Sequence, residues 1–448
     1  MNTTFLSFSV LLLVVLSHHH CNGLKEDDKI DRLPGQPYNG VDFNQYSGYV
    51  PVNPEAGRAF FYYFVESSGK DASWRPLVLW LTGGVFCSSI GIGAFTEIGP
   101  FRVNEDSKTL DLNQYAWNQE ANILFVDNEV GVGFSYSNTS SDYQTYDFAA
   151  SIPDTYAFLV SWLQRFPEYK DADVFLAGEG YSGNTAIHLG QFILQKSKYP
   201  NQQKINLKGI AVGNAFIDKE ADYKGFIEYD WSHNLVSEEI YMGIKSSCNF
   251  NFSDSNNTGW SDKCQQYLDM RRNILKNINV YDIYSPLCNS TRGSNPYEYQ
   301  GPCSTDYVSD YFNNPDVQIA LHANLTVTPY PWSLCNYTGN WSDYPDTALP
   351  AITELVAQGI QILIYNGDLD TFNSITSAKY AIDKLGLSIV TPWYQWYHQN
   401  EVSGFVIGYE NLVFASVRGG GHFVPASQPA RALELFTSFV TGLLPPSK

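Results

Sequence analysis

The stretch VFLAGEGYSG at residues 174–183 constrains the fold more than any other part of this 448-residue chain. Four apolar residues predict a buried strand, a glycine-rich corner follows, and the apolar spacing of residues 184–194 predicts a helix. A strand, a sharp turn and a helix in this order form the elbow that holds a nucleophilic serine in a strained, exposed position. The centre of this elbow is Gly180, however. The sequence therefore predicts a framework built for a nucleophile whose side chain is missing.

Apolar runs elsewhere predict the rest of the sheet. Near-continuous runs, which fit strands covered on both faces, occur at residues 76–81, 122–127, 206–213, 362–365 and 412–417. Residues 46–52 and 58–65 predict an antiparallel pair, and helical spacing is present at residues 147–166, 315–322 and 428–441. Strands that alternate with helices predict an α/β fold with a doubly wound, mostly parallel sheet and a site at the carboxyl ends of its strands.

Residues 216–325 differ in composition from the rest of the chain. They are rich in aromatic residues, Asn, Ser and Asp, show little strand periodicity, and contain Cys248, Cys264, Cys288 and Cys303. We interpret them as an inserted cap subdomain that disulfides staple together. The expected core therefore consists of residues 24–215 and 326–448.

Residues 1–23 predict a secretory signal peptide, with an apolar segment at residues 5–16 and small residues near a cleavage point. Its removal leaves six cysteines, which in an oxidising compartment predict three disulfides and leave their pairing open. The mature chain contains N-x-[ST] glycosylation sequons at Asn138, Asn251, Asn256, Asn289, Asn324, Asn336 and Asn340. We expect a glycoprotein of the secretory pathway, either extracellular or vacuolar.

The charge balance argues against several classes of partner. With 46 acidic and 27 basic residues the formal net charge is −19, which disfavours nucleic acids and anionic membranes. Outside the leader, no uncharged apolar stretch reaches the ~18 residues that a membrane span needs. The chain has no HExxH or CxxC motif, and its histidine cluster at residues 18–20 lies in the leader, so we expect neither a metal site nor a cofactor.

Two polar residues after predicted strands complete a catalytic pattern. Asp370 follows the strand at residues 362–365, and His422 lies in a glycine-rich loop after the strand at residues 412–417. The order elbow, Asp, His along the chain is that of the α/β-hydrolases. In such a site the imidazole acts as general base and the carboxylate fixes its tautomer.

A candidate oxyanion hole accompanies this pair. Gly83 and Gly84 follow the strand at residues 76–81, as expected of a loop that lends a backbone N–H to an oxyanion. The N–H of Tyr181, directly after the elbow centre, would be the second donor. A plain tight turn is the alternative interpretation of the two glycines.

Taken together, the motifs of the chain resemble those of the serine carboxypeptidases, in particular the plant serine carboxypeptidase-like proteins, over essentially the whole mature length. The family's WLNGGPGCSS is similar to residues 80–89, its GVGFSYS is intact at residues 131–137, and its GESYAG, GDxD and GAGHxVP resemble residues 178–183, 367–370 and 419–425. The resemblance implies an α/β-hydrolase fold, release of C-terminal residues from peptides, and a peptide or small acyl ligand in the cleft.

The resemblance also implies roles for individual residues. Asp370 and His422 would be the acid and base of the triad, and Gly84 and Tyr181 would line the oxyanion hole. Substrate binding would fall to Thr82, Gly83 and Glu179, with Thr82 and Glu179 at the terminal carboxylate of the peptide. The implied disulfides are Cys87–Cys335, Cys248–Cys264 and Cys288–Cys303.

The departures from the family pattern lie near the expected chemistry. Gly180 replaces the nucleophilic serine, Thr82 replaces an asparagine, and Val85 and Phe86 replace a proline and a glycine. Glu129 adds a carboxylate that would disfavour an anionic ligand if it were ionised. Loss of a triad nucleophile costs on the order of 10⁶ in turnover. We therefore predict a protein that is inactive or severely impaired as a peptidase.

Three hypotheses remain open. The first is a folded carboxypeptidase-like protein that has lost the chemistry and acts by binding. The second is a working carboxypeptidase, acyltransferase or lyase with a displaced nucleophile such as Ser182, although two residues along a helix turn that side chain by roughly 200°. The third is that Gly180 is a laboratory substitution or a sequence error in an active peptidase. A homodimer is also left open.

Overall fold

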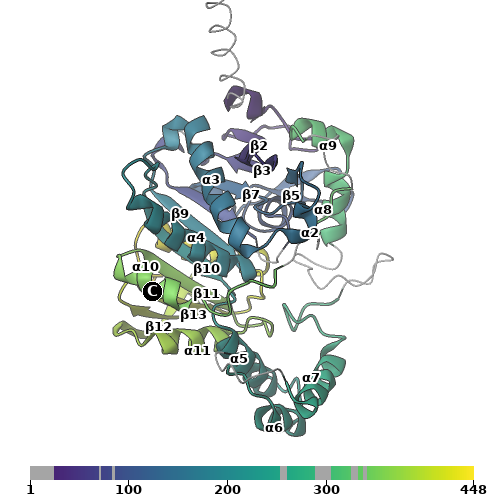
Figure 1. The fold of residues 1–448 in the computed structure, drawn as a ribbon, viewed down its shortest axis with the longest axis vertical. Coiled ribbons are helices and arrows are strands. Elements are labelled where there is room, and N and C mark those ends of the chain that lie inside the picture. Colours follow the sequence, from purple (N-terminus) through teal and green to yellow (C-terminus); the bar gives the residue numbers. More distant parts are fainter. Residues whose placement is uncertain are drawn as a thin grey trace, which may run out of the picture.

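The computed structural model describes residues 25–69, 72–82, 86–252, 260–287, 304–323, 331–336 and 341–448. A large sheet runs through the centre of the molecule (Figure 1). Its middle consists of parallel strands in the order β7 (Asn122–Val126), β4 (Leu77–Leu81), β9 (Val174–Glu179), β10 (Leu207–Gly213), β11 (Gln361–Gly367) and β14 (Leu412–Val417). This order confirms the predicted doubly wound, mostly parallel α/β fold.

Antiparallel strands extend the sheet at both edges. One edge is formed by β3 (Arg58–Val65), β2 (Gln45–Asn53), β1 (Lys29–Ile30) and the short β8 (Tyr136–Ser137). The other edge is the hairpin of β13 (Glu401–Tyr409) and β12 (Ile389–His398). The sequence analysis predicted the pair β2 and β3 but not this hairpin. Most of β12 is exposed or half-buried, so it lacks the apolar run that marks a core strand.

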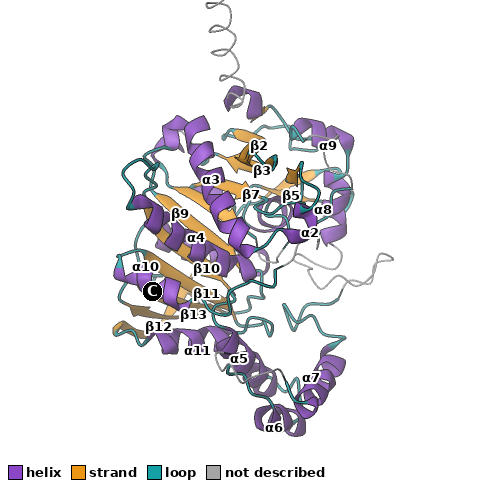
Figure 2. Cartoon of the chain, viewed as in Figure 1, coloured by secondary structure: helices purple, strands orange, loops and turns teal. Residues whose placement is uncertain are grey.

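Helices cover both faces of the sheet (Figure 2). On one face lie α3 (Phe148–Arg165), α4 (Tyr181–Ser197), α10 (Leu349–Ala357) and α11 (Ile375–Leu385), whose apolar residues share a core with Leu77, Leu79 and Leu81 of β4. On the other face, η3 (Ile90–Glu97), α12 (Val424–Ser427) and α13 (Pro429–Val440) share a core with Val78 and Trp80. Alternate residues of β4 therefore enter opposite layers, as expected of a strand that is buried on both faces.

The segment predicted as an insertion lies in two places. The helices α5 (Lys219–Ser232), α6 (Glu238–Ser247) and α7 (Asp262–Leu275) form a lobe beside α11 with its own apolar core (Figure 1). The helix α8 (Ser304–Phe312) instead packs against η3 and β5 (Phe101–Val103), and α9 (Pro315–Ala320) packs against α8, at a distance from that lobe. The boundaries 216–325 for a single subdomain thus remain a prediction.

The remaining elements are short. They are η1 (Lys25–Asp28), η2 (Ala72–Trp74), β6 (Leu110–Leu112), η4 (Trp117–Gln119), α2 (Asp142–Thr145) and η5 (Pro167–Tyr169). Within the described ranges, no helix is both long enough and apolar enough to cross a membrane.

Two of the three disulfides implied by the family resemblance are present. Cys87 is bonded to Cys335, and Cys248 is bonded to Cys264. The signal peptide, Cys288 and Cys303 lie outside the described residues, as do four of the sequons, at Asn256, Asn289, Asn324 and Asn340. Of the sequons that the structure describes, Asn138 and Asn251 are exposed, whereas Asn336 is half-buried and donates a hydrogen bond from Nδ2 to Gly131 O at 2.9 Å.

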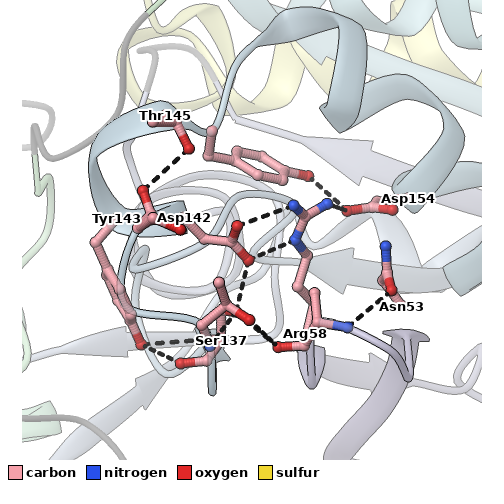
Figure 3. Close-up of polar contacts among 11 residues, drawn as sticks. Asn53, Arg58, Ser137, Asp142, Tyr143, Thr145 and Asp154 are labelled. Atoms are coloured by element: carbon pink, nitrogen blue, oxygen red, sulfur yellow. Dashed lines mark hydrogen bonds and ion pairs between the residues drawn. The ribbon is translucent and has the colours of Figure 1, made fainter.

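An ion-pair network anchors the segment that follows β7 (Figure 3). Arg58 at the start of β3 binds both carboxylate oxygens of Asp142 in α2, at 2.6 and 3.0 Å. It also donates to Asp154 of α3 at 3.0 Å, and Ser137 Oγ donates to Asp142 at 2.6 Å. One guanidinium thus joins β3, α2 and α3, and Ser137 ties β8 to the same carboxylate. The network fixes the path of the chain between β7 and α3.

Candidate active site

The elbow between β9 and α4 has the shape that a catalytic serine requires. Gly180 lies between them with φ of 55° and ψ of −125°, a conformation that residues with a side chain rarely adopt. A Cβ atom on Gly178 would lie 2.4 Å from Ser182 O, and one on Gly183 would lie 2.5 Å from the Cβ of Ala215. The glycines on either side of the centre therefore allow the close approach of helix and strands, and the elbow persists although its centre carries no side chain.

The predicted acid–base pair is formed at the carboxyl ends of β11 and β14. His422 Nδ1 lies 2.8 Å from Asp370 Oδ2, and both residues are buried. Because the carboxylate can only accept, Nδ1 carries the proton and Nε2 holds the lone pair that a general base needs. Gly180 N donates a hydrogen bond to Gly213 O at 3.1 Å. Asn214, which follows Gly213, donates a hydrogen bond to Asp370. The end of β10 therefore links the elbow to the acid–base pair.

Asp370 is held by several donors besides His422. Asn214 Nδ2 donates to Oδ2 at 2.8 Å, Phe372 N donates to Oδ1 at 2.7 Å, and Asn373 N donates to Oδ2 at 3.2 Å. Hydrogen bonds of this kind fix the orientation of the carboxylate. The sequence analysis missed Asn214, although its position directly after β10, at the edge where the site lies, was a usable signal.

The expected oxyanion hole is only partly described. Tyr181 is the first residue of α4, so its N–H lies at the helix N-terminus, where free N–H groups and the helix dipole favour negative charge. Gly83, Gly84 and Val85 lie outside the described residues. Phe86, which follows them, has φ of 64°, a left-handed conformation that glycine adopts without strain and phenylalanine does not.

Thr82 and Ser182 contact each other rather than the cleft. Ser182 Oγ donates to the carbonyl oxygen of Thr82 at 2.5 Å and is buried. Thr82 Oγ1 accepts a hydrogen bond from Trp80 Nε1 at 2.7 Å and is buried as well. The Ser182 hydroxyl thus fastens the start of α4 to the end of β4, an arrangement that suits a structural residue and not a nucleophile.

Glu179 faces a second buried carboxyl group, that of Glu97 at the end of η3. Burial raises the pKa of Glu97 to about 7, and burial together with the charge of Glu97 raises the pKa of Glu179 well above its usual range. Two buried carboxyl groups beside each other cannot both ionise readily, so the pair favours holding at least one proton. The sequence analysis missed Glu97, and its signal was a single acidic residue in the otherwise apolar stretch at residues 90–100.

Glu129 is buried beneath the loop that precedes η3. Its Oε2 accepts a hydrogen bond from Phe86 N at 2.5 Å. Burial, assisted by the nearby charge of Asp127, raises the pKa of Glu129 to about 8. The expected repulsion of an anionic ligand by an ionised Glu129 therefore applies only at alkaline pH.

A cavity of about 320 Å³ opens beside the elbow, between the core and the lobe of α5 to α7. Tyr181 lines it from the elbow, and Phe372 and Asn373 line it from the loop that carries Asp370. Its wall is largely aromatic and includes Phe216, Tyr223, Phe226 and Trp260. The arrangement suits an apolar or aromatic group held beside the elbow and the loop that carries Asp370.

Known proteins resemble this chain in sequence and in fold. The serine carboxypeptidase family model matches residues 34–442. The Arabidopsis thaliana protein serine carboxypeptidase-like 40 is 45% identical over 428 residues, which cover 93% of this chain and 83% of that protein. Serine carboxypeptidase 24 of the same plant is 40% identical over 458 residues, which cover 98% and 97% of the two chains.

A solved structure confirms the α/β-hydrolase fold. The crystal structure of KEX1(delta)P, a prohormone-processing carboxypeptidase from Saccharomyces cerevisiae, matches with a TM-score of 0.80 and covers 94% of this chain and 96% of its own. The two sequences are 23% identical. This likeness concerns the arrangement of strands and helices and carries nothing about substrate.

Proposed function

Because this chain belongs to the serine carboxypeptidase family, we propose that it is a secreted carboxypeptidase-like protein that binds peptide C-termini and is inactive or severely impaired in cleaving them. The observation that carries the proposal is Gly180. The elbow keeps a sharp strand-to-helix turn and His422 lies within hydrogen-bond distance of Asp370, whereas the atom that would attack the scissile carbonyl is absent.

The residues that remain supply binding and proton transfer but no covalent step. Asp370 fixes the His422 tautomer, so Nε2 can accept a proton from a hydroxyl or a water molecule. The N–H of Tyr181 offers a hydrogen bond to a carbonyl oxygen. Without a nucleophile, the enhancement that oxyanion hole and binding provide is only about 10³–10⁴ over water.

Glu179 and Glu97 favour a carboxylate ligand at acidic pH. While the pair holds its protons, it can donate hydrogen bonds to the terminal carboxylate of a peptide. Burial raises the pKa of Glu97 to about 7, so ionisation above that pH adds a charge that repels the same ligand. Mildly acidic conditions are therefore the right ones for a test, and the aromatic cavity favours an apolar penultimate side chain.

The deciding experiment restores the nucleophile with Gly180→Ser. We expect the variant to react with an organophosphonate probe and to hydrolyse blocked dipeptides, with turnover rising toward ~10⁶-fold above the parent if the rest of the site is assembled. A serine at φ of 55° is strained, so the variant should also lose about 1–3 kcal/mol of stability.

Two further variants give this experiment its controls. His422→Ala in the Gly180→Ser background should abolish turnover, because the serine would lose its base. Ser182→Ala should leave the labelling of Gly180→Ser unchanged, because Ser182 bonds to Thr82. The proposal fails if the parent protein itself hydrolyses the dipeptides and His422→Ala abolishes that activity.

An active carboxypeptidase or acyltransferase is the alternative, with Ser182 as the nucleophile or with Gly180 a sequence error. Probe labelling of Ser182 in the parent protein would support the first version. A serine codon at position 180 in the source transcript would establish the second. The buried hydrogen bond from Ser182 to Thr82 does not favour Ser182 as the nucleophile, and it does not favour a sequence error at position 180 either.

We also propose that the protein is delivered to the secretory pathway and ends outside the cell or in the vacuole. The described disulfides suit an oxidising compartment, and two described sequons are exposed. A shift in gel mobility after glycosidase treatment of the protein made in its source tissue is the expected result.

A further inference from the structure

Residues 279–283 of the chain run across the two loops that carry the acid–base pair. We call this segment, which follows α7, the strap. Val280 O accepts a hydrogen bond from Thr371 N at 3.0 Å, and Ile283 N donates to Leu369 O at 3.1 Å. The strap therefore binds the residue on either side of Asp370.

The same segment binds the histidine loop. Tyr281 O accepts a hydrogen bond from the backbone N of His422 at 2.6 Å. A Cβ atom on Gly421 would lie 2.7 Å from Tyr281 O, so this close approach needs a glycine before the histidine. One backbone segment thus holds the neighbours of Asp370 and His422 itself, although the two loops follow different strands.

The ring of Tyr281 packs on the imidazole. Its centroid lies 4.8 Å from that of His422, in an edge-to-face arrangement, and 5.3 Å from that of Phe372. Aromatic contacts of this kind are worth about 0.5–1.5 kcal/mol and restrict the orientation of the rings. The side chain of Asn279 orients the strap in turn, because Oδ1 accepts a hydrogen bond from Tyr281 N at 3.0 Å.

Helices of the lobe hold the loop that carries Asp370 as well. Arg271 of α7 pairs with Asp230 of α5 at 2.5 Å, and the Thr371 hydroxyl is hydrogen-bonded to the same Asp230. Tyr229 Oη of α5 donates to Asp368 O at 2.6 Å. The loop that carries Asp370 is consequently fixed to the lobe as well as to β11.

We propose that Tyr281 is a positioning residue for His422 and that the strap sets the geometry of the acid–base pair. The inference rests on the proposed roles of Asp370 as acid and His422 as base. It extends that proposal, because the lobe then helps to position these two residues and does not only cover the cleft. A shift of about 1 Å in a catalytic group can cost 10²-fold in rate, so a strap of this kind has a measurable effect.

The test reads the pair directly and does not depend on ligand binding. In protein with isotope-labelled histidine, the Nδ1 proton of His422 bonded to Asp370 gives a strongly deshielded NMR signal, and the imidazole pKa follows from its titration. We expect Tyr281→Phe to keep both at parental values, because the ring and the backbone remain. Tyr281→Ala should broaden or abolish the signal and displace the titration.

Tyr284→Ala is the matched control, since this tyrosine lies three residues further along and is 78% exposed. It should leave the signal unchanged. In the Gly180→Ser background, Tyr281→Ala should lower kcat by about 10- to 100-fold with little change in KM. If Gly180→Ser stays inactive, the site has lost more than its nucleophile, and the NMR result still decides the role of the strap. Hydrolysis by the parent protein, by contrast, overturns the proposed function alone.

Hydrogen exchange on the unmodified protein gives a second measurement, which does not depend on whether a variant folds. The amides of His422 and Thr371 should be protected as strongly as those of the adjoining core strands. Rapid exchange at both amides would overturn the proposal. So would a folded Tyr281→Ala protein whose signal and titration match those of the parent.

Discussion

Glu129 and Phe86 lie at two distant positions in the sequence, and a hydrogen bond joins them. Phe86 adopts a left-handed conformation, and its N–H donates to Glu129 Oε2 at 2.5 Å. The bond compensates part of the strain that a phenylalanine incurs in this conformation. The Phe86 ring also packs edge-to-face on Trp341 at 5.7 Å. The two residues therefore form one local structure next to the expected oxyanion loop.

Glu129 should make the protein less stable as the pH rises. Its pKa is raised from an ordinary value of 4.5 to about 8, mainly by burial, so the folded state holds a proton that the unfolded state releases. The contribution to stability is therefore complete below the pKa of the unfolded state. It falls as the pH rises from about 4.5 to about 8, by roughly 1.4 kcal/mol for each pH unit within that window.

Glu129→Gln keeps an acceptor for Phe86 N and removes the titration. Urea unfolding at about pH 5 and about pH 8 should show a smaller loss of stability for this variant than for the parent. Other buried carboxyl groups, Asp127 among them, contribute the same trend in both proteins, so only the difference between the two profiles counts. Parallel profiles would show that Glu129 is ionised in the folded state.

At the scale of elements, the Arg58 network holds β3, β8, α2 and α3 together. Arg58→Met keeps the apolar stem and leaves the carboxylates of Asp142 and Asp154 without their cation. We expect a loss of roughly 3 kcal/mol, because removing one partner of a largely buried ion pair strands the other. Denaturant unfolding measures this loss.

Arg75→Met is the control for that prediction. Arg75 pairs with Glu120 at 3.2 Å, but its side chain is 46% exposed, and such pairs contribute about 1 kcal/mol or less. Equal losses of stability for Arg58→Met and Arg75→Met would contradict the view that the buried Arg58 network anchors the segment between β7 and α3 more strongly than an exposed ion pair could.

The sequence predicted those elements whose burial produces a recognisable pattern of apolar residues within one short stretch. β9 and β14 appeared as apolar runs, and α3 and α13 as helical spacing, because each buries its own pattern against the sheet. The hairpin of β12 and β13 left no such pattern, since only one residue of β12 is buried and the buried positions of β13 are mostly glycine and serine instead of large apolar residues. Hydrogen bonding to β14 organises this hairpin, and pairing of that kind cannot be found in a single stretch of sequence.

The residues of the candidate site likewise fall into those that a local sequence pattern predicts and those that only the fold brings together. Asp370, His422 and Gly180 could be predicted because each follows a recognisable strand. Glu97 was missed because its partner, Glu179, is 82 residues away in sequence and only the fold brings the two carboxyl groups together. Tyr281 was missed because it lies far from His422 in the sequence, and only the fold brings its carbonyl oxygen and its ring onto the histidine.

At the scale of the whole molecule, the disulfide between Cys87 and Cys335 closes a loop with a sequence separation of 248 residues. It joins the end of the expected oxyanion loop to the chain as it returns to the core. Ser88 N donates to Leu334 O and Asn336 N donates to Phe86 O, both at 2.8 Å, so backbone hydrogen bonds flank the bridge on both sides.

Removing this bridge should destabilise the protein more than removing the other described one. Cys248–Cys264 has a separation of only 16 residues, and chain entropy predicts a contribution of about 3 kcal/mol for such a loop and about 5 kcal/mol for the longer one. We expect Cys87→Ser with Cys335→Ser to lose correspondingly more in denaturant unfolding than Cys248→Ser with Cys264→Ser. The flanking hydrogen bonds should preserve the local structure, so the effect should come mainly from the freed unfolded chain. If the short bridge proved the costlier one to lose, the lobe of α5 to α7 would depend on its disulfide for folding, and its support of the Asp370 loop would depend on that bond too.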